Sequence, residues 1–320
     1  MDTIILNSEI ARDTLEGLSA SPKYLLPKYF YDEKGSKIFQ DIMKMPEYYL
    51  TNCESEIFAN QKSDITDNFL SDDSPFDLIE LGSGDGFKTK ILLRHMQNLN
   101  YDFNFIPIDI SEEITNDLVD ELQTEMPDLK VEPKTGDYFH VLKELNEFTH
   151  KRKVILFLGA NIGNYSDTEA NEFINHVAEF THTGDKFLIG IDLKKSPRII
   201  VDAYNDPHGH TRDFNLNLLT RLNRELDADF DVDQFIQHTT YNPQTGDIKS
   251  FLISKTDQEV KINSLEKSFY FREWEPIFME RSKKYDMQAI VKLASVNGFK
   301  VEQNFTDSNN YFVDSLWVKM

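Results

Sequence analysis

The sequence predicts an α/β fold with a mostly parallel central sheet, interrupted by a second, α+β domain. From Phe76 onward, short apolar runs alternate with amphipathic stretches, which is typical of successive βαβ units. A glycine-rich loop follows the first apolar run. The alternation stops after Asp192 and returns near Tyr285, as expected of an insertion into an α/β domain.

Four apolar runs are predicted as strands of the central sheet. Each run is continuous and is bounded by Gly, Asp or Asn, which suits strands that are covered on both faces. The predicted strands are Phe76–Leu81, Phe103–Ile108, Val154–Leu158 and Lys186–Ile191.

The amphipathic stretches between these runs are predicted as helices, namely Thr89–Leu99, Ser111–Glu125 and Asp167–Phe180. Their first residues include side chains that can accept a hydrogen bond from an exposed first-turn amide. We expect Ser111 to cap the second helix, and Asp167 or Thr168 to cap the third.

The segment from Lys194 to about Ser282 is predicted as the inserted domain. It contains a turn at Asn205–His210, a helix at Phe214–Leu226 and β-like segments around Gln237–Ser254. Residues 1–59 precede the first predicted strand and could pack on either domain.

After the insertion the α/β alternation returns. A helix is predicted at Tyr285–Val296, with a left-handed stop at Asn297-Gly298. Two closing strands are predicted at Phe299–Thr306 and Tyr311–Val318.

Composition excludes several classes of partner. The chain has 34 basic and 55 acidic residues and a formal net charge of -21. A field of this sign repels phosphate backbones and anionic lipids, so we expect neither nucleic acid nor membrane partners. The N-terminus does not match a secretory signal, and Cys53 is the single cysteine, which excludes an intrachain disulfide and a cysteine-based zinc site. We therefore expect a cytoplasmic protein.

The loop from Glu80 to Gly86 reads Glu-Leu-Gly-Ser-Gly-Asp-Gly and joins the first predicted strand to a helix. Glycines at alternate positions let the backbone approach a ligand closely. A dinucleotide fingerprint would require a further glycine at the position of Phe87. The spacing instead resembles the loop of class I S-adenosylmethionine-dependent methyltransferases, in which the acid at Glu80 can face the positively charged methionyl end. The alternative is a purely structural turn.

Acids and amides also occur where neighbouring strands end. Asp109 can accept hydrogen bonds from ribose hydroxyls, and Asp137 occupies the place where class I enzymes commonly contact adenine. Either acid alone could instead cap a helix or form a turn. The loop Gly159–Tyr165 contains Asn161 and Asn164, which could serve as turn residues or hold an amine.

Taken together, these residues resemble the ergothioneine-pathway histidine Nα-methyltransferases, which are grouped with fungal relatives acting on other amino acids. The resemblance extends over nearly the whole chain. Its markers are Leu26–Tyr31, Gly35-Ser36, Pro46–Tyr49, the glycine loop with Lys88-Thr89, Ile106–Asp109, Phe157–Asn164, Ala203-Tyr204, Phe214–Asn217, Arg224–Leu226, Asp229–Asp231 and Met279–Ser282.

The resemblance implies a Rossmann-like class I methyltransferase sheet with an inserted α+β substrate-binding domain. The S-adenosylmethionine-binding domain would comprise residues 60–193 and 283–320, and the substrate-binding domain residues 1–59 and 194–282.

The resemblance also implies roles for individual residues. The cofactor contacts would be Gly82, Ser83, Gly84, Lys88, Asp109, Asp137, Tyr138 and Phe39. Tyr31 and Phe39 would form walls of the reacting centre, Tyr48 and Asn164 would hold the α-amine, Tyr204 the carboxylate, and Glu280 with Ser282 the imidazole. Tyr31, Tyr48 and Asn164 would be the catalytic residues. Ser250 aligns with a position where histidine-specific members can carry methionine, which leaves the substrate open.

We predict an enzyme that trimethylates L-histidine to its betaine, hercynine, with S-adenosylmethionine as the methyl donor. The alternatives are the same transfer to a different amino acid or related amine, and a non-catalytic cofactor-binding sensor. Tyr31 or water would take up the proton that the amine loses. No obligate protein partner is evident. We expect no metal, and His208 and His210 are interpreted as surface residues in a turn.

Overall fold

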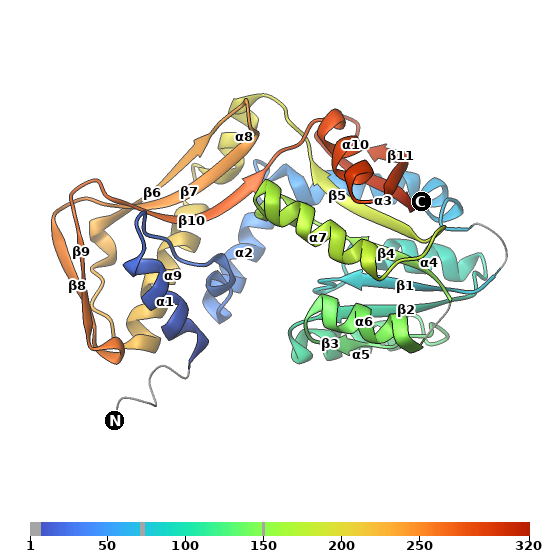
Figure 1. Ribbon diagram of the computed structural model, residues 1–320, viewed down its shortest axis with the longest axis horizontal. Coiled ribbons are helices and arrows are strands. Elements are labelled where there is room, and N and C mark those ends of the chain that lie inside the picture. Colours follow the sequence, from blue (N-terminus) through green and yellow to red (C-terminus); the bar gives the residue numbers. More distant parts are fainter. Residues whose placement is uncertain (1–7, 71–73, 149–150) are drawn as a thin grey trace. The chain divides into compact units, whose positions relative to one another are not determined.

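The computed structural model describes residues 8–70, 74–148 and 151–320 (Figure 1). A seven-stranded sheet has the order β11-β12-β5-β4-β1-β2-β3. Its strands are β1 Phe76–Leu81, β2 Phe103–Asp109, β3 Lys134–Thr135, β4 Arg152–Phe157, β5 Lys186–Asp192, β11 Phe299–Thr306 and β12 Phe312–Lys319. β1 pairs in parallel with both β2 and β4, while β12 is antiparallel to β5 and β11. The predicted α/β class, with a mostly parallel sheet, is confirmed.

This topology creates a switch point at β1. The chain leaves β1 toward β2 on one side, and β4 lies on the other. In open α/β sheets, ligands bind outside the carboxyl ends of the strands at such a point. The glycine loop after β1 therefore lies where a cofactor is expected.

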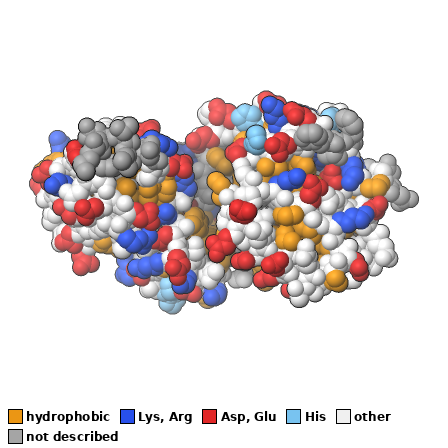
Figure 2. Space-filling view, turned by 90° about the horizontal axis from the view of Figure 1, so that it is seen from below, with side chains coloured by type: hydrophobic (Ala, Val, Ile, Leu, Met, Phe, Trp, Pro, Cys, Tyr) orange, Lys and Arg blue, Asp and Glu red, His pale blue; other side chains and the backbone are white. Residues whose placement is uncertain are grey.

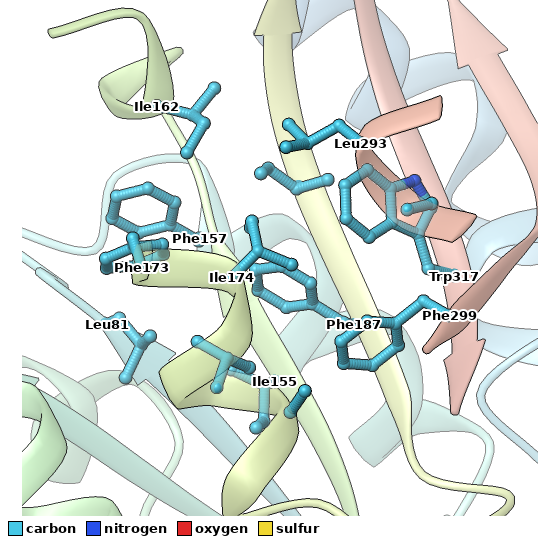
Figure 3. Close-up of a cluster of buried hydrophobic side chains, with 14 of the residues drawn as sticks. Leu81, Ile155, Phe157, Ile162, Phe173, Ile174, Phe187, Leu293, Phe299 and Trp317 are labelled. Carbon is cyan, nitrogen blue, oxygen red and sulfur yellow. The ribbon is translucent and has the colours of Figure 1, made fainter. Parts of the chain in front are cut away.

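Helices cover both faces of the sheet (Figure 1). They are α3 Tyr49–Asp67, α4 Thr89–Asn98, α5 Glu112–Glu125, α6 Tyr138–Phe148, α7 Asp167–Glu179 and α10 Met287–Val296. One apolar core joins the sheet to α6, α7 and α10, with Phe157, Phe173 and Trp317 among its largest members (Figure 3). A buried core of this kind fixes the strand ends from which the site residues project.

The helix caps were only partly predictable. Ser111 caps α5 by accepting a hydrogen bond from the Ile114 amide, as predicted. The prediction that Asp167 or Thr168 caps α7 was wrong, because Ser166 is the cap and Glu169 returns a bond to the Ser166 amide. Gly298 has a φ of 77° and ends α10, as predicted.

The chain divides into two compact units. Unit 1 comprises Met1–Tyr49 and Lys195–Ser282, and unit 2 comprises Leu50–Lys194 and Lys283–Met320. Unit 2 contains the seven-stranded sheet. Unit 1 contains a three-stranded sheet of order β10-β7-β6 and a separate two-stranded pair, β8-β9.

The elements of unit 1 come from both of its segments. They are α1 Glu9–Ser19, η2 Pro27–Phe30, α2 Glu33–Lys44, α8 Pro197–Tyr204, α9 His210–Leu226, η4 Val232–Gln234, β6 Phe235–Tyr241, β7 Asp247–Ser254, β8 Gln258–Ile262, η5 Asn263–Leu265, β9 Lys267–Phe271 and β10 Pro276–Lys283. α9 begins at His210 rather than at the predicted Phe214, because the Asp206 carboxylate accepts hydrogen bonds from the His210 and Thr211 amides.

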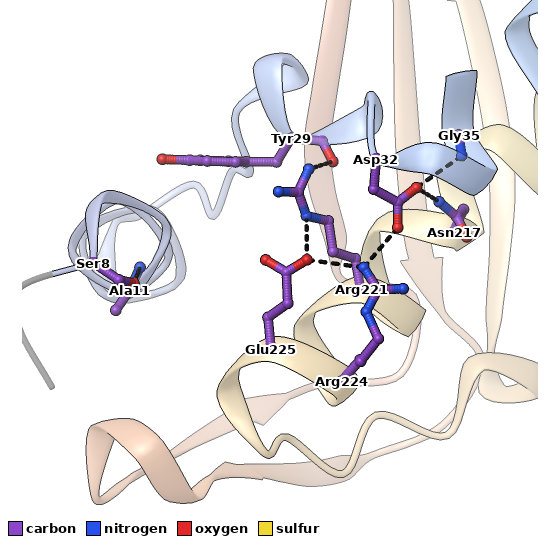
Figure 4. Close-up of polar contacts among 9 residues, drawn as sticks. All are labelled: Ser8, Ala11, Tyr29, Asp32, Gly35, Asn217, Arg221, Arg224 and Glu225. Carbon is purple, nitrogen blue, oxygen red and sulfur yellow. Dashed lines mark hydrogen bonds and ion pairs between the residues drawn. The ribbon is translucent and has the colours of Figure 1, made fainter. Parts of the chain in front are cut away.

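Asp32 anchors the N-terminal segment of unit 1 to α9 (Figure 4). Its Oδ1 caps α2 through the Gly35 amide at 2.7 Å and accepts a bond from Asn217 Nδ2 at 2.8 Å. Its Oδ2 pairs with Arg224 at 2.8 Å. These bonds hold the pKa of Asp32 below its ordinary value against the opposing effect of burial. Because Tyr31 directly precedes Asp32, these bonds also restrain the backbone next to Tyr31.

The surface carries charge of both signs. Figure 2 shows acidic side chains spread over the face in view, with Lys and Arg between them. Within the described residues, no helix has the length and apolar character required to span a membrane.

Candidate active site

The glycine loop of unit 2 has a left-handed backbone. Gly82 has a φ of 73° and Gly84 a φ of 52°, values that L side chains rarely adopt. A Cβ on Gly82 would lie 2.8 Å from the Tyr138 hydroxyl, whereas a Cβ on Gly84 would meet no atom within 4 Å. The loop therefore borders open space at Gly84, whereas at Gly82 it lies close to Tyr138.

Glu80 lies below this loop and is almost fully buried. Its Oε1 accepts a hydrogen bond from Thr89 Oγ1 at 2.6 Å, which ties β1 to the start of α4. Burial raises the pKa of Glu80 to about 8, although the Thr89 bond and Lys88 act in the opposite direction. Among the described residues, Glu80 Oε2 and Ser83 Oγ are buried without a hydrogen-bond partner.

Asp109 connects the end of β2 to the glycine loop. Its Oδ2 accepts a bond from the Gly84 amide at 3.2 Å, and its Oδ1 accepts one from the Ser111 amide at 3.1 Å. These bonds fix the carboxylate beside the loop. A ribose contact would use the remaining lone pairs of the same oxygens.

Asp137 and Tyr138 follow β3. Asp137 Oδ1 accepts hydrogen bonds from the Phe139 and His140 amides at 3.0 and 3.1 Å. This oxygen therefore caps the start of α6, which is the alternative role considered for Asp137. The residue is exposed. Burial first, then the charge of Asp109, raises the pKa of Tyr138 to about 12, which keeps its hydroxyl protonated.

Lys88 immediately precedes α4, and its ammonium forms an ion pair with Glu54 on α3. Burial lowers its pKa, but Glu54 more than compensates, and the net pKa lies above the ordinary value. Lys88 is therefore a charged, partly exposed group that follows the same loop in the chain.

The second loop lies after β4. Asn161 Nδ2 donates to the Leu158 carbonyl at 2.9 Å, so this amide serves the turn. Ala160 has a φ of 61°, an uncommon conformation for a residue with a Cβ. Asn164 ends the short helix η3 Asn161–Asn164 and is exposed.

Unit 1 gathers aromatic side chains predicted to surround the reacting amine. Ring centroids are 5.4 Å apart for Tyr31 and Phe39, 6.3 Å for Phe39 and Tyr48, and 6.3 Å for Tyr48 and Tyr204. The ring of Phe214, from α9, lies 5.4 Å from Tyr31 and 5.7 Å from Phe39. Phe39 thus belongs to this cluster in unit 1, whereas the other predicted cofactor residues belong to unit 2.

Polar groups adjoin the aromatic cluster. Tyr204 Oη donates to Ser282 Oγ at 2.9 Å, and both residues are buried. Although 48% of Tyr31 is exposed, burial of its hydroxyl raises its pKa well above the ordinary value, and Glu280, Tyr48 and Tyr204 add to this rise. The structure therefore brings together six of the predicted residues that lie in unit 1, namely Tyr31, Phe39, Tyr48, Tyr204, Glu280 and Ser282.

Ser250 is buried on β7, the central strand of the three-stranded sheet, and faces Thr239 in the strand register. Sequence reasoning missed Thr239 and Gln237, whose side chains donate to the Tyr204 carbonyl at 2.9 and 3.3 Å. It also missed the role of Phe214 in the aromatic cluster. Exposure alternates along β6 and places Gln237 and Thr239 on its less exposed face, but the strand's sequence does not alternate polar and apolar residues and so gave no local signal for them.

The basic residues that surround Glu280 in the sequence have other carboxylate partners. Arg281 pairs with Asp247 at 3.6 Å, Lys284 pairs with Asp192 at 2.7 Å, and Lys283 pairs with Asp167. Glu280 itself lies on β10, half-buried, within electrostatic reach of Tyr31.

His208 lies 3.9 Å from Glu47, and its ring centroid is 6.2 Å from that of His210. In the described part of the chain, no group of three or more His, Cys, Asp or Glu residues is placed to hold a metal ion.

A parallel sheet with a glycine loop at its switch point, and acids at the ends of neighbouring strands, has the features expected of an S-adenosylmethionine-dependent methyltransferase. The sequence model of one family, described as histidine-specific methyltransferase, SAM-dependent, matches residues 10–319. The chain belongs to this family.

Individual relatives agree with this assignment. The histidine N-alpha-methyltransferases of Mycolicibacterium smegmatis and Mycobacterium tuberculosis are each 33% identical to the chain, over 97% of this chain and 95% of theirs. The Ergothioneine biosynthesis protein 1 of Schizosaccharomyces pombe is 29% identical over 88% of this chain but only 38% of its own length.

The residues around the loop fit the family's cofactor. S-adenosylmethionine carries a sulfonium, an ammonium and a carboxylate, together with ribose hydroxyls. Unit 2 presents the buried, incompletely bonded carboxyl group of Glu80, whose ionisation a positive charge would favour, the cation of Lys88 for negative charge, and the acceptor Asp109 for hydroxyls. The bound cofactor supplies an electrophilic methyl group.

Proposed function

We propose that this enzyme transfers methyl groups to the α-amine of L-histidine until the trimethylated betaine is formed. One observation supports this most strongly: Tyr31, Tyr48, Tyr204, Glu280 and Ser282 converge within unit 1. The two mycobacterial relatives, which are named as histidine N-alpha-methyltransferases, point to the same substrate.

The proposed cofactor contacts are Gly82, Ser83, Gly84, Lys88, Asp109, Asp137, Tyr138 and Phe39. Within this set, we assign Lys88 to the cofactor carboxylate, because that carboxylate is the one anionic group of the methyl donor. Asp109 is assigned to the ribose, and the exposed Asp137 to the adenine amine.

Methyl transfer to an amine requires a nitrogen lone pair aligned with the bond between methyl carbon and sulfur. An ammonium has no such pair, so each transfer also releases a proton. Three transfers to one histidine ammonium yield one trimethylammonium, three S-adenosylhomocysteines and three protons. Neutral hydrogen-bonding groups favour the reactive amine, whereas a carboxylate would favour the ammonium. Tyr48 and the carboxamide of Asn164 meet this requirement, and we assign the amine to them.

Recognition of the rest of the substrate is assigned to unit 1. A half-buried carboxylate at Glu280 suits an imidazole N–H, and Ser282 suits the other ring nitrogen. Tyr204 is assigned to the substrate carboxylate, with its hydroxyl already oriented by Ser282. The buried Ser250 contributes to the same pocket.

The aromatic rings of unit 1 suit a product that becomes a quaternary ammonium. Such a cation has no N–H to donate, but it is stabilised over the faces of aromatic rings. Tyr31, Phe39 and Tyr48 provide these rings. A site of this kind tolerates each added methyl group.

The alternative substrate is another amino acid or a related amine. It is favoured by Ser250, because the family resemblance implies that histidine-specific members can carry methionine at this position. We place the reaction in the cytoplasm, since Cys53 is the single cysteine of the chain.

Steady-state rates with a panel of amino acids test the substrate assignment. Glu280→Gln keeps the side-chain shape but removes the charge, and it should lower kcat/KM for histidine by about 100-fold, in line with the loss of a charge-assisted hydrogen bond. Rates with amino acids lacking an imidazole should change little. Glu259→Gln, on an exposed position of β8, is the matched control.

A uniform loss of activity over the whole panel in Glu280→Gln would argue against the imidazole contact. Ser250→Met extends the test. If histidine is the substrate, this variant should retain or improve the preference for histidine, and a shift of preference to another amino acid would support the alternative.

A further inference from the structure

Glu54, on α3, makes two contacts with unit 2 loops that no local sequence pattern suggests. Its Oε2 pairs with the ammonium of Lys88, and its Oε1 accepts a hydrogen bond from the Gly159 amide at 2.8 Å. The side chain is almost completely buried. One carboxylate thereby connects Lys88, which follows the glycine loop, to Gly159, the first residue of the loop that contains Asn164.

The sheet leaves space for this carboxylate at Gly190 on β5. A Cβ on Gly190 would lie 2.5 Å from Glu54 Oε1 and 3.1 Å from the Gly159 nitrogen. No ordinary Cβ contact is that short, so a larger residue at this position would displace Glu54. In the antiparallel register, Gly190 faces Asp314 on β12.

Asp314 completes a buried group of ionisable side chains. Burial first, then the negative charge of Glu54, raises the pKa of Asp314 well above its ordinary value. The rise disfavours a second negative charge beside Glu54, while Glu54 raises the pKa of Lys88 above its ordinary value. Glu80 on β1 also acts on Lys88 in the same direction. A buried charge is stable only when it is paired in this way.

A lysine side chain is long and flexible, so an unrestrained ammonium does not hold a fixed direction. Glu54 restrains the ammonium of Lys88 from one side and leaves part of the lysine exposed. The same carboxylate fixes the Gly159 amide, and a hypothetical Cβ on Gly159 would lie 3.6 Å from Lys88 Nζ. The ammonium and the start of the second loop are thus held close together.

We propose that Glu54 is a positioning residue for the amino-acid end of S-adenosylmethionine: it orients Lys88 toward the cofactor carboxylate and fixes the adjoining loop at Gly159. This inference rests on the cofactor role proposed above for Lys88. Its consequence is specific. Loss of Glu54 should weaken ligands that carry the amino-acid end, and spare ligands that lack it.

Calorimetric titration with two product-like ligands tests this. S-adenosylhomocysteine retains the amino-acid end, and 5′-methylthioadenosine lacks it. In Glu54→Gln, the Kd for S-adenosylhomocysteine should rise by about tenfold or more, while that for 5′-methylthioadenosine should stay within about twofold. Asp77→Asn is the matched control, since Asp77 is a buried, lysine-paired carboxylate at the opposite end of β1.

If Glu54 had a purely structural role, Glu54→Gln would raise the Kd values of both ligands equally, and that result would overturn the proposal. Unchanged or tighter binding of S-adenosylhomocysteine would overturn it as well. If Glu54→Gln does not fold, Glu54→Asp keeps the charge but is too short to retain both contacts, and the same selective loss is expected. Failure of both variants to fold would also overturn it, because Glu54 would then serve the fold. A parent protein that binds neither ligand would instead contradict the proposed function.

Discussion

The hydroxyl of Tyr204 donates a hydrogen bond to Ser282 Oγ over 2.9 Å, and the two buried residues join the end of α8 to β10. Both were implied as substrate contacts by resemblance to the family, but for different parts of histidine. Their direct bond means that the two proposed contacts are not independent. A change at one residue alters the orientation of the other.

Replacing Ser282 with alanine should therefore impair substrate binding in two ways. It removes one proposed imidazole partner and also the hydrogen bond that orients the buried Tyr204 hydroxyl. We expect the KM for histidine to rise by about tenfold or more, equivalent to roughly 1.4 kcal/mol or above, while the KM for S-adenosylmethionine stays within about twofold. Steady-state kinetics with each substrate varied in turn measure both values.

Ser268→Ala, at an exposed position on β9 of the same unit, is the control for this variant. Equal increases in both KM values for Ser282→Ala would indicate a general loss of structure rather than a substrate contact.

Tyr31 should not act as the base that takes the amine proton. Its pKa is raised well above the ordinary value, chiefly by burial of the hydroxyl and then by Glu280, so the phenol stays protonated throughout the working pH range. We expect Tyr31→Phe to retain the shape of the pH profile of kcat, with a decrease of less than about tenfold. The exposed Tyr270→Phe serves as the control. Loss of one limb of the profile in Tyr31→Phe would identify the tyrosine as a proton acceptor after all.

Substitutions at two glycines can distinguish the effect of ligand contact at the first loop from the effect of backbone strain. Gly84 and Gly184 both have positive φ, 52° and 93°, and a Cβ on either would meet no protein atom within 4 Å. Replacing either glycine with alanine should lower the free energy of unfolding by roughly 1 kcal/mol. Only Gly84→Ala should also weaken cofactor binding, by about tenfold or more, because only Gly84 belongs to the cofactor loop.

Thermal unfolding and calorimetric titration of the two glycine variants measure these effects. Equal cofactor affinity in Gly84→Ala and Gly184→Ala would remove the argument that the backbone of Gly84 is approached closely by a ligand.

Glu80 should make stability depend on pH. Its pKa is about 8 in the folded protein, against an ordinary value of 4.5. The folded state therefore binds more protons than the unfolded state between these values, and the free energy of unfolding falls as the pH rises through this window. Glu80→Gln removes the effect. As the pH rises from about 5 to about 9, the free energy of unfolding of the variant should increase relative to that of the parent by on the order of a few kcal/mol.

Urea unfolding of parent and Glu80→Gln at both pH values measures this difference. A stability difference that is the same at both values would show that Glu80 ionises normally in the folded protein.

The sheet of unit 2 could be predicted because its signals are local. Runs such as Phe76–Leu81 are apolar throughout, and the glycine loop directly follows one of them, so element type and ligand class depend on a few adjacent residues. The α7 cap was misassigned because Ser166 and Asp167 are both good caps, and Glu169 decides between them.

Other parts of the site could not be predicted, because they depend on contacts between distant residues. Glu54 meets Lys88 across 34 positions and Gly159 across 105, and nothing around Glu54 in the sequence indicates either partner. Thr239 reaches the Tyr204 carbonyl through the strand register of unit 1. Family resemblance indicated the residues expected to touch ligands, but not those that hold them in place.

The mass of the product formed from L-histidine and S-adenosylmethionine tests the proposed Nα-methyltransferase activity. We expect histidine to acquire three methyl groups, all on the α-nitrogen, with one S-adenosylhomocysteine released for each. The absence of any methylated histidine, while another amino acid of the panel is methylated under the same conditions, would contradict it.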